Sequence, residues 1–452
     1  MTASFGTIAD ARHPKVQGLC RTQTLTVCSI KPPWIKALVA VTGPTAVPGR
    51  GQWLISLRRG GDSYTPAMTR LLLSCGEPSG DTYGGALVHE IGKLGETPEV
   101  FGLGGDRLAE QGASLIAHVR DLAVVGLWEV VSHLPRFRRI FREILAEVDR
   151  CRPDAAVLVD YPDFNLRLAR ELKARQVPVV YYVSPQVWAW RRRRIKAIRQ
   201  TVARMLVIFP FEEAFYRQSG VPVTFVGHPL VDLVRPAPDR GAFLKASGLD
   251  PNRPLLAILP GSRRQEVAHN LPPLLGAIRL LAERKPDLQF ALPLAPSLPG
   301  EVFRQALAGL PVRCLEGQAH QLLGACDAAV VASGTATVEA ALLGTPLVVV
   351  YRLSGLTYRL GRRFVKVPHY AMVNLIAGRR VAPEIIQREF TAERVAEEAL
   401  SLLGDPARRL RMKQDLAEVR QKLGGGGASA RAARALLEVL GLRPPGPERL
   451  GS

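Results

Sequence analysis

The sequence has no apolar run long enough to cross a membrane, and its cysteines are few and scattered. Six cysteines in 452 residues show no C-x-x-C spacing, which argues against a zinc knuckle or a disulfide framework and favours a reducing compartment. No stretch approaches the roughly 18 apolar residues of a spanning helix. We therefore expect neither a transmembrane protein nor a small disulfide-stapled module.

Acidic residues are also in short supply. The chain carries 40 Asp and Glu against 60 Lys and Arg, which gives a formal net charge of +20 and a pI near 10.2. Such a basic surface favours phosphate, nucleic acid or anionic lipid as a partner. The apolar fraction of 47% is ordinary for a globular chain, and the length allows two or three domains.

Residues 1–67 lack any sustained periodicity. Proline and glycine recur every few residues, and no single apolar core follows a basic start, so a secretory signal is not indicated. An organellar transit peptide fits the composition in part. Because Met68 directly precedes the first convincing strand, we expect this segment to be a disordered extension or the result of a misassigned start.

From Arg70 onward, short apolar runs alternate with amphipathic stretches, which is the rhythm of βαβ units. The predicted strands are 71–74, 100–103, 155–159, 179–183, 205–208 and 223–226, followed by 255–259, 290–294, 328–332 and 347–351. The pattern predicts two doubly wound, Rossmann-like α/β domains at residues 68–228 and 229–400. Helical residues follow, and 401–452 form C-terminal helices interrupted by the glycine run 424–427.

Polar residues directly after the apolar runs are informative, because parallel sheets bind ligands beyond the carboxyl ends of their strands. In the first domain, the small-residue turn Gly76–Asp81 can hold an anion on its amides, although a glycine turn with Ser79 or Asp81 as helix N-cap also explains it. Asp160 follows a buried strand, where a carboxylate can act as a general base. Helix capping is the alternative role, and it suits Asp163 better.

Two comparable turns occur in the second domain. Ser262 and Arg263 lie in a glycine turn before a helix, where a guanidinium beside helix amides suits a diphosphate; surface salt bridging is the alternative. Glu339 lies about one turn into a later helix, where a carboxylate can accept both hydroxyls of a ribose. Small polar residues crowd the start of that helix, where phosphate meets the positive end of the dipole: Ser333, Gly334 and Thr335.

A further segment combines two tryptophans, Trp188 and Trp190, with the four arginines at 191–194. Such a combination suits a lipid headgroup layer or nucleic acid. A run of arginines is also often no more than a solvated helix face, and the pattern alone leaves these readings open.

Taken together, these motifs identify a family. The chain from about Met68 to its end resembles lipid-A-disaccharide synthases, which are inverting glycosyltransferases of the two-domain GT-B architecture. We therefore expect the two domains to face each other across a cleft and the C-terminal helices to pack back on the first domain. The resemblance rests on the order and spacing of seven motifs: GEPSGD (76–81), DYPDFN (160–165), YVSPQVWAWR (182–191), GHP (227–229), LPGSR (259–263), SGTATVEAALLGTP (333–346) and the pair Tyr351-Arg352.

The resemblance implies transfer of a diacylglucosaminyl unit from UDP-diacylglucosamine to diacylglucosamine 1-phosphate, forming the β-1,6-linked disaccharide of lipid A and UDP. It implies Asp160 as the base for the acceptor hydroxyl, Arg263 as the group that stabilises charge on UDP, and Glu339 as the ribose ligand. The other substrate-binding residues that we expect are Gly76, Glu77, Ser79, Asp81, Ser262, Ser333, Gly334, Thr335 and Asn374. Asn374, expected to line the cleft, follows Val373 where the family usually has proline.

Both implied substrates carry acyl chains, so we expect the enzyme to act at a membrane surface. The segment 124–141 mixes aliphatic and aromatic residues with arginines and corresponds to the family's hydrophobic patch; a core helix is the alternative, and Pro135 predicts a bent or two-piece helix. Membrane contact is expected from Val125, Trp128, Val130, Val131, Leu134 and Phe137. The implied location is the cytoplasmic face of the inner membrane, with peripheral association.

The sequence indicates no cofactor, metal site or nucleic-acid partner. The histidines show no ligand spacing, and His228 lies in a matched motif. A homodimer through exchanged C-terminal segments, which the glycine run 424–427 permits, stays open.

Two other functions compete with that of the resembled family. A related enzyme acting on UDP-N-acetylglucosamine would not share the DYPDFN motif. A binding protein that has lost catalysis would not need Asp160, Arg263 and Glu339 together, and their joint presence argues against it.

Overall fold

The computed structural model describes residues 68–122, 127–187, 194–295, 298, 300–353 and 369–442, with backbone only at 121, 122, 127–134 and 302. All of these residues belong to one compact unit, Asp62–Ser452. The prediction for residues 1–67 lies outside the described residues, as do Trp188, Trp190 and the arginines at 191–193.

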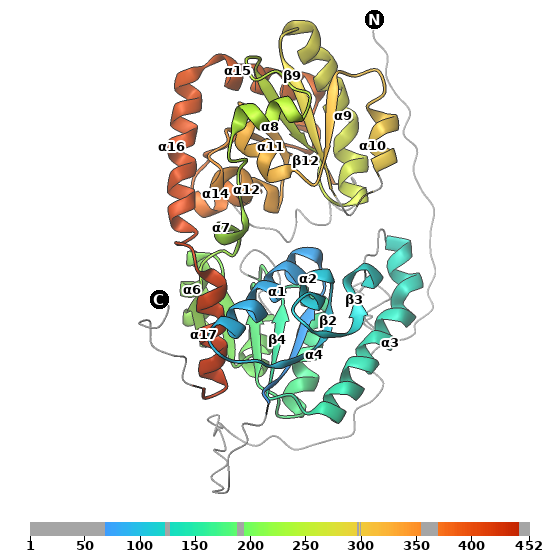
Figure 1. The fold of residues 1–452 in the computed structure, drawn as a ribbon, viewed down its shortest axis with the longest axis vertical. Helices are drawn as coiled ribbons and strands as arrows, with labels where there is room; N and C mark the ends of the chain where they lie inside the picture. The colour runs from blue at the N-terminus through green and yellow to red at the C-terminus, as the bar shows by residue number, and fades with distance from the viewer. Residues whose placement is uncertain are drawn as a thin grey trace, which may run out of the picture. The chain divides into compact units, whose positions relative to one another are not determined.

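The first domain is built on a seven-stranded parallel sheet in the order β3-β2-β1-β4-β5-β6-β7 (Figure 1). Its strands are β1 (Arg70–Cys75), β2 (Glu99–Gly104), β3 (Ser114–His118), β4 (Ala155–Val159), β5 (Val179–Tyr182), β6 (Arg204–Val207) and β7 (Val223–Phe225). Its helices are α1 (Pro78–Lys93), α2 (Asp106–Ala109), α3 (Leu127–Cys151), α4 (Pro162–Ala174), α5 (Arg194–Thr201) and α6 (Pro210–Gln218), with a 3₁₀ turn η2 (Val119–Leu122). The short helix α7 (Leu230–Leu233) follows the first domain and contacts α12 (Thr335–Leu342) of the second.

The second domain repeats this plan with a six-stranded parallel sheet in the order β10-β9-β8-β11-β12-β13. Its strands are β8 (Leu255–Leu259), β9 (Gln289–Leu294), β10 (Val312–Glu316), β11 (Ala328–Ala332), β12 (Leu347–Tyr351) and β13 (Glu384–Ile386). Its helices are α8 (Arg240–Ala246), α9 (Arg264–Arg284), α10 (Gly300–Ala306), α11 (Ala319–Ala325), α12 (Thr335–Leu342), α14 (Met372–Ala377), α15 (Ala392–Gly404) and α16 (Pro406–Lys422), with a 3₁₀ turn η3 (Gln387–Glu389).

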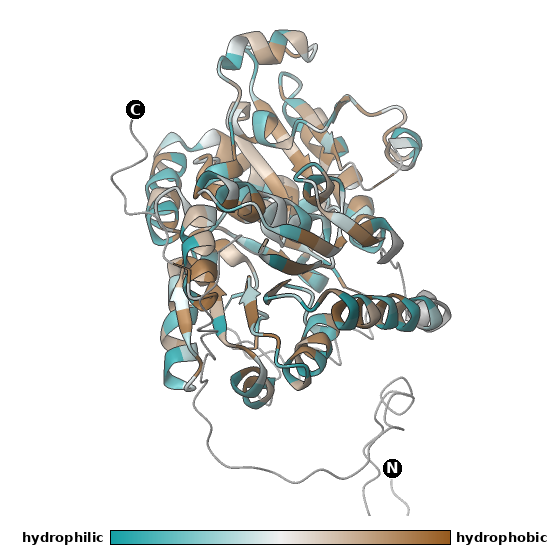
Figure 2. Ribbon diagram, turned by 60° about the horizontal axis from the view of Figure 1, so that its bottom comes forward, coloured by the Kyte–Doolittle hydropathy of each residue, from teal (hydrophilic) through white to brown (hydrophobic). Residues whose placement is uncertain are grey.

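The alternation of buried residues along the strands explains why helices cover both faces of the first sheet. On β1, Leu71 and Leu73 join the core cluster that includes α1, whereas Leu72 faces the opposite cluster with residues of α3 and α4. Figure 2 shows the hydrophobic strands between helices that carry hydrophilic outer stretches. Strands buried on both faces read as continuous apolar runs, so the predicted α/β class with two doubly wound domains is confirmed.

The strand order reverses once in each sheet, between β1 and β4 and between β8 and β11. Adjacent parallel strands whose connections run in opposite directions leave a crevice at their carboxyl ends, which is where doubly wound sheets bind ligands. The turn at Gly76 follows β1, Asp160 follows β4, Arg263 follows β8, and Ser333 follows β11. All four predicted turns therefore lie at the switch points.

Helix α3 corrects one prediction. It continues as a single helix from Leu127 to Cys151 with Pro135 inside it, so the two-piece helix is not found. A proline removes one helical hydrogen bond, and the loss is offset because Ile140, Ile144 and Val148 bury one face of the helix against the first sheet.

The C-terminal part of α3 is therefore a core helix, which was the alternative to a membrane-contacting segment. Phe137, expected at a membrane, is partly buried and packs against that core cluster. The side chains of Trp128, Val130, Val131 and Leu134, and all of Val125, lie outside what the structure describes.

The C-terminal helices divide between the domains, so the expectation that they pack back on the first domain is confirmed for α17 but not for α16. Helix α16 packs on α12 and α14 of the second domain, whereas α17 (Ala428–Val439) packs on α1, β5 and β6 of the first (Figure 1). The crossing at 423–427 is hydrogen-bonded to the earlier crossing at 226–232: His228 donates its amide to Leu423 O over 2.9 Å, and the carboxylate of Asp232 accepts from the amides of Gly427 and Ala428.

Candidate active site

Asp160 stands directly after β4 in an unusual backbone conformation. Asp160 and Tyr161 both have positive φ, 46° and 49°, in the left-handed region that few non-glycine residues adopt. Such strain persists only where the surroundings over-determine it, and it is common at functional sites. The side chain of Asp160 remains partly exposed at the strand end.

A buried hydrogen-bond network holds this strained corner in place. The amide of Asn165 donates to the carbonyls of Ser74, Val159 and Asp160 and accepts from the Ser74 hydroxyl, over 2.7–3.2 Å. Tyr181 donates its hydroxyl to the Asp160 carbonyl at 2.6 Å. Asn165 thereby ties the end of β1 to the end of β4. Asn165 is the last residue of the DYPDFN motif, and nothing in its sequence context indicates this positioning role.

The pKa of Asp160 differs from that of an ordinary aspartate. Burial and the nearby carboxylate of Glu77 raise its pKa to about 6, while a backbone hydrogen bond from Tyr161 and the charge of Arg263 oppose this rise. A general base works best when its pKa lies close to the working pH. Asp160 therefore has a stronger basicity than an ordinary aspartate and stays largely ionised at neutral pH.

The turn after β1 is shaped by close packing. A side chain at Gly76 would overlap the ring of Tyr161, whose Cγ lies 2.1 Å from the position of a Cβ, so only glycine fits there. Glu77 is the N-cap residue of α1 in an extended conformation and keeps its side chain partly exposed. Ser79 lies half-buried in the first turn of α1.

Asp81 has a structural role in the first domain. Its buried carboxylate accepts hydrogen bonds from the amides of Gly105, Arg107 and Leu108 at 2.6–3.1 Å, and so caps the start of α2 from a distance. Both carboxylate oxygens are engaged within the protein, so this geometry does not support the expected substrate contact of Asp81.

The turn after β8 carries Arg263. Gly261 has a φ of +124° and a built Cβ would meet Glu266, while Glu266 accepts a hydrogen bond from the amide of Ser262 at 3.3 Å. Arg263 is the N-cap residue of α9, with 65% of its side chain exposed. The turn is thus fixed through its backbone, whereas the guanidinium projects outward.

Arg263 joins the two domains. Its Nη2 donates to Glu77 Oε2 over 2.9 Å, and its Nη1 lies 3.5 Å from Glu266 Oε1. These carboxylates raise the pKa of the guanidinium against the opposing effect of burial. The ion pair brings the end of β8 close to the end of β1 and within electrostatic reach of Asp160. Three of the predicted site residues therefore form one cluster.

The start of α12 presents the second group of predicted residues. Gly334 is its N-cap residue, Thr335 is exposed in its first turn, and the Ser333 hydroxyl donates to Tyr370 O at 3.0 Å. Glu339 lies one turn further along, 3.7 Å from Nε2 of His320. His320 was not predicted as a site residue, because the histidines show no ligand spacing. Nothing in the sequence marks His320 as the neighbour of Glu339.

Asn374 corrects another expectation. It is fully buried, and its amide donates to Ala382 O and Glu384 Oε1 and accepts from the amides of Val381 and Ala382, all over 2.7–2.9 Å. Both the nitrogen and the oxygen of the Asn374 amide are therefore hydrogen-bonded to residues within 381–384. Asn374 therefore braces this loop, and its side chain does not line a cleft.

Asn270 plays a bracing role in the second domain like that of Asn165 in the first. Its amide donates to Pro260 O at 2.9 Å and accepts from the amide of Arg352 at 3.0 Å, which ties the end of β8 to the end of β12. Arg352 lies over the ring of Phe390 at 5.2 Å and donates to its carbonyl. Of the motif pair Tyr351-Arg352, Arg352 therefore has a structural role, because it links the end of β12 to Asn270 and Phe390.

His228 of the GHP motif is buried between the rings of Tyr83 and Phe209. Burial lowers its pKa to about 3, so the ring is neutral, and Nδ1 accepts from the amide of Leu230 at 3.2 Å. His228 therefore positions the crossing between the domains.

Among the described residues, no group of three or more His, Cys, Asp or Glu has the arrangement of a metal site. The four cysteines described, Cys75, Cys151, Cys314 and Cys326, are free thiols. None of the described helices combines the length and the apolar character that a membrane span requires.

The architecture is shared with enzymes of the GT-B type. A UDP-N-acetylglucosamine 2-epimerase from Neisseria meningitidis bound to UDP-GlcNAc superimposes with a TM-score of 0.58 at 14% identity, over 82% of this chain and 100% of that one. The glycotransferase of kitacinnamycin gives a TM-score of 0.57 at 18% identity, over 82% and 98%. At these identities the likeness concerns the fold.

Sequence relatives narrow the class to a family. The family model described as Lipid-A-disaccharide synthetase matches residues 71–439. The lipid-A-disaccharide synthase of Koribacter versatilis is 49% identical over 380 residues, covering 82% of this chain and 99% of the relative. That of Myxococcus xanthus is 47% identical over 380 residues, covering 83% and 98%. This chain belongs to the lipid-A-disaccharide synthase family and is a glycosyltransferase, as its motifs predicted.

Proposed function

We propose that this chain transfers a 2,3-diacylglucosaminyl unit from its UDP derivative to 2,3-diacylglucosamine 1-phosphate, forming the β-1,6-linked disaccharide 1-phosphate of lipid A and releasing UDP. The proposal rests on family membership and on one observation above all. A carboxylate with a pKa near 6 stands at a switch point, and an arginine from the facing domain lies within its electrostatic reach.

The proposed chemistry is a single displacement. Asp160 accepts the proton of the acceptor's 6-hydroxyl as that oxygen attacks the anomeric carbon, and the bond from that carbon to the diphosphate breaks. Inversion follows because nucleophile and leaving group occupy opposite faces of the sugar. The base belongs to the first domain and the charge-stabilising groups to the second, which suits substrates held between them.

Departure of UDP requires stabilisation of negative charge. We assign this role to the Arg263 guanidinium, which matches phosphate oxygens in a two-pronged geometry, and to the backbone amides of Gly334 and Thr335 at the start of α12. The diphosphate competes with Glu77 for Arg263, so donor binding exchanges one ion pair for another. Glu339 is proposed to receive the ribose hydroxyls, with His320 3.7 Å away as its neighbour.

The turns supply the remaining contacts. Gly76, Glu77 and Ser79 are proposed to meet the acceptor side, and Ser262 and Ser333 the donor side. Asp81 and Asn374 are proposed as braces for these turns, because their side chains are engaged within the protein.

Membrane association is proposed on charge and sequence. The net charge of +20 favours the anionic cytoplasmic face of the inner membrane, and the segment 124–134 carries the apolar residues for peripheral binding. Replacing Trp128 and Val131 with serine is expected to reduce sedimentation with anionic vesicles; unchanged sedimentation would contradict this part. Helix α17 packs on the first domain of its own chain.

The decisive experiment measures UDP release in detergent from UDP-diacylglucosamine, with and without diacylglucosamine 1-phosphate. Release that depends on the acceptor is the expected result. Release without acceptor would indicate a hydrolase or an epimerase-like activity, and no release from the full chain would contradict the proposal. Repeating the assay with a chain that starts at Met68 tests whether residues 1–67 contribute.

A further inference from the structure

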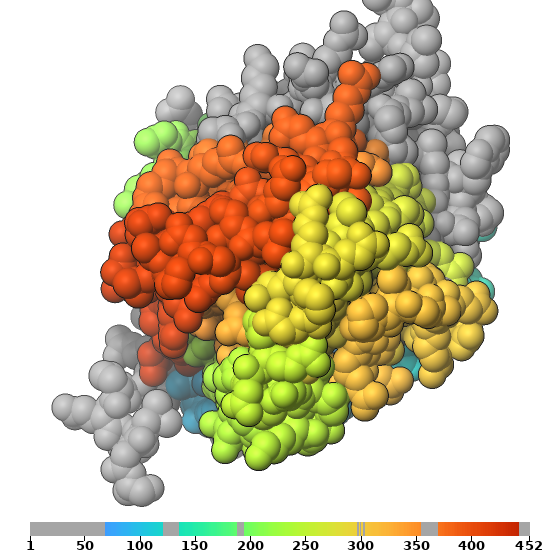
Figure 3. Space-filling view, turned by 90° about the horizontal axis from the view of Figure 1, so that it is seen from above, coloured from blue at the N-terminus to red at the C-terminus, as the bar shows by residue number. Residues whose placement is uncertain are grey.

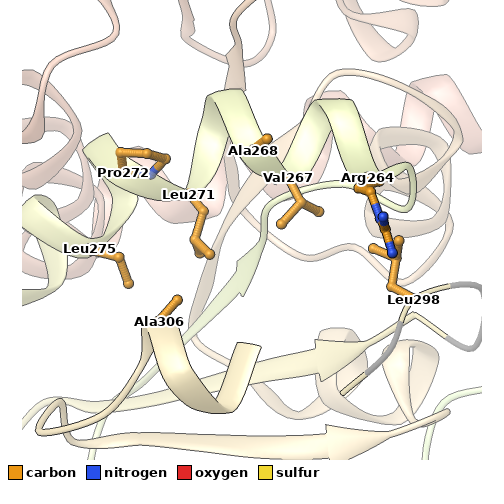
Figure 4. Close-up of a pocket in the computed structure, with 8 residues that line it drawn as sticks. All are labelled: Arg264, Val267, Ala268, Leu271, Pro272, Leu275, Leu298 and Ala306. Atoms are coloured by element: carbon orange, nitrogen blue, oxygen red, sulfur yellow. The ribbon is translucent and has the colours of Figure 1, made fainter. Parts of the chain in front are cut away.

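A narrow apolar hollow lies in the second domain beside the proposed donor site. Its volume is about 220 Å³, and seven of its eight lining side chains are apolar (Figure 4). Helix α9 contributes one wall through Arg264, Ala268, Leu271 and Leu275, and Ala306 of α10 lies opposite. In Figure 3 the yellow surface of α9 borders the orange surface of residues near 300.

The hollow is elongated along α9. Its lining residues on that helix run from Arg264 to Leu275 at helical spacing, which corresponds to about 16 Å of helix. Figure 4 shows Arg264 and Leu298 at one end and Leu275 with Ala306 toward the other. The hollow therefore has a cationic end and an apolar remainder.

The cationic end is the end nearest the proposed chemistry. Arg264 is the first residue of α9 and directly follows Arg263, the N-cap residue that pairs with Glu77. A molecule whose anionic part lies at Arg263 would therefore meet the hollow as it extends along α9. This polarity matches an amphiphile with a phosphate-bearing head and an apolar tail.

An unfilled apolar hollow is unfavourable for the protein on its own, because its lining atoms lose packing contacts. Ala268 and Pro272 are exposed at its rim, while Val267 and Leu271 are buried at its floor. A cavity of about 150 Å³ lined by similar side chains binds a molecule as large as benzene. The hollow of this chain therefore has room for several methylene groups.

We propose that this hollow, lined by α9 and α10, is the binding site for one acyl chain of the lipid-linked sugar donor. The inference rests on the proposed function, which supplies a donor with acyl chains. The tail lies against Ala268, Leu271 and Leu275, and the ester or amide end of the chain lies near Arg264. The hollow thereby makes the donor's affinity depend on acyl length, by about fourfold for each methylene buried.

The test fills the hollow from its exposed rim. Ala268→Phe places a ring in the hollow without replacing a buried residue, and Ala306→Phe does the same from α10. The matched control is Ala308→Phe, an exposed alanine two residues beyond the lining. Thermal unfolding and the dissociation constant for UDP are measured for each variant, to show that fold and nucleotide site are intact.

The readout is KM for two synthetic donors, UDP-glucosamine with tetradecanoyl chains and with butanoyl chains, at a fixed detergent mole fraction. Ala268→Phe and Ala306→Phe are expected to raise KM for the tetradecanoyl donor about 15- to 60-fold, the loss of two or three buried methylenes. KM for the butanoyl donor is expected to stay within about twofold, and Ala308→Phe is expected to change neither.

The possible failures are distinguishable. If the wild-type chain is active and both hollow-filling variants keep its preference between the donors, the acyl site is wrong while the proposed function stands. An equal rise in KM for both donors would also overturn the acyl site. If the wild-type chain releases no UDP from either donor in the presence of acceptor, the proposed function fails, and the inference that rests on it fails too.

Discussion

The two switch points of this molecule are built alike in topology and differently in chemistry. At the first, after β1 and β4, a buried side-chain network of Ser74, Asn165 and Tyr181 holds the strained backbone that carries the Asp160 carboxylate. At the second, after β8 and β11, glycine turns and helix starts leave an exposed arginine and backbone amides. These differences suit the roles proposed for the two switch points, because a proton acceptor requires a fixed direction and a tuned pKa, whereas a diphosphate site requires positive charge that can reach its ligand.

Replacing Asp160 is the strongest way to test this contrast. Asp160→Asn is expected to lower turnover about 10²- to 10⁴-fold, the usual effect of losing a general base, with UDP affinity unchanged. Asparagine tolerates the positive φ of this corner, so the backbone is expected to hold. Steady-state turnover and calorimetric UDP binding measure the two effects.

The matched control is Asp163→Asn, which alters an exposed carboxylate three residues away that pairs with Arg194. It is expected to be nearly silent. Full turnover in Asp160→Asn would remove Asp160 from the mechanism and would place the base elsewhere.

Removing Arg263 tests the second switch point. Arg263→Ala is expected to lower turnover about 10²- to 10³-fold, as for the loss of a preorganised group that stabilises developing charge, and also to weaken UDP binding. Arg263→Lys is expected to recover only part, because a lysine lacks the planar fork. Rapid-mix turnover and UDP titration follow both effects.

Arg284→Ala, at the far end of α9, is the control for lost positive charge. Equal losses in Arg263→Ala and Arg284→Ala would mean that general surface charge, and not a local contact, supports the reaction.

The two bracing asparagines allow a direct comparison between the regions. Asn165→Ala removes hydrogen bonds to three carbonyls, and Asn270→Ala removes those to Pro260 O and to the amide of Arg352. Each substitution is expected to reduce the free energy of unfolding by about 2–4 kcal/mol. Asn165→Ala is expected to lower turnover about tenfold with UDP affinity retained, because it frees the corner that carries Asp160. Asn270→Ala is expected to weaken UDP binding instead.

Urea unfolding and UDP titration measure both variants. Identical functional effects from the two substitutions would argue that the switch points do not have separate tasks.

The smallest expected effect is a shift in pH dependence. Because Glu77 helps raise the pKa of Asp160 to about 6, activity is expected to fall as the pH drops through about 6 and the base becomes protonated. Glu77→Gln removes that repulsion, lowers the pKa of Asp160 and moves the acid limb of kcat/KM to lower pH. Burial, the larger cause, persists, so a shift of up to about one pH unit is expected.

Glu90→Gln, on the same helix but paired with Lys93, is the control for this pH profile. An acid limb that stays in place in Glu77→Gln would show that another group controls the reaction at low pH.

Much of the fold follows from the sequence because central parallel strands are buried on both faces. Four predicted strands match the structure residue for residue: Ala155–Val159, Leu255–Leu259, Ala328–Ala332 and Leu347–Tyr351. The strands that the sequence did not indicate are β3, β10 and β13, each at or near a sheet edge. Edge strands such as Val312–Glu316 are half-solvated and carry charged residues, so no apolar run marks them.

The candidate site was predictable in its location and only partly in its roles. Strand-end turns can be read from sequence, which located Asp160 and Arg263. Whether a polar side chain faces a ligand or the protein depends on which backbone groups need partners. Asp81 and Asn374 look like Glu77 and Glu339 in the sequence, yet nearby amides use their oxygens completely.

The two crossings between the domains are bonded to each other. Leu423 and Gly427 are hydrogen-bonded to His228 and Asp232, so the segment that leaves the first domain and the segment that returns to it are held together. Any rotation of one domain that kept these bonds would pivot at the crossings and would change the distance between Arg263 and Asp160. The crossings would then set the axis about which the proposed base and the proposed charge-stabilising arginine move apart or together.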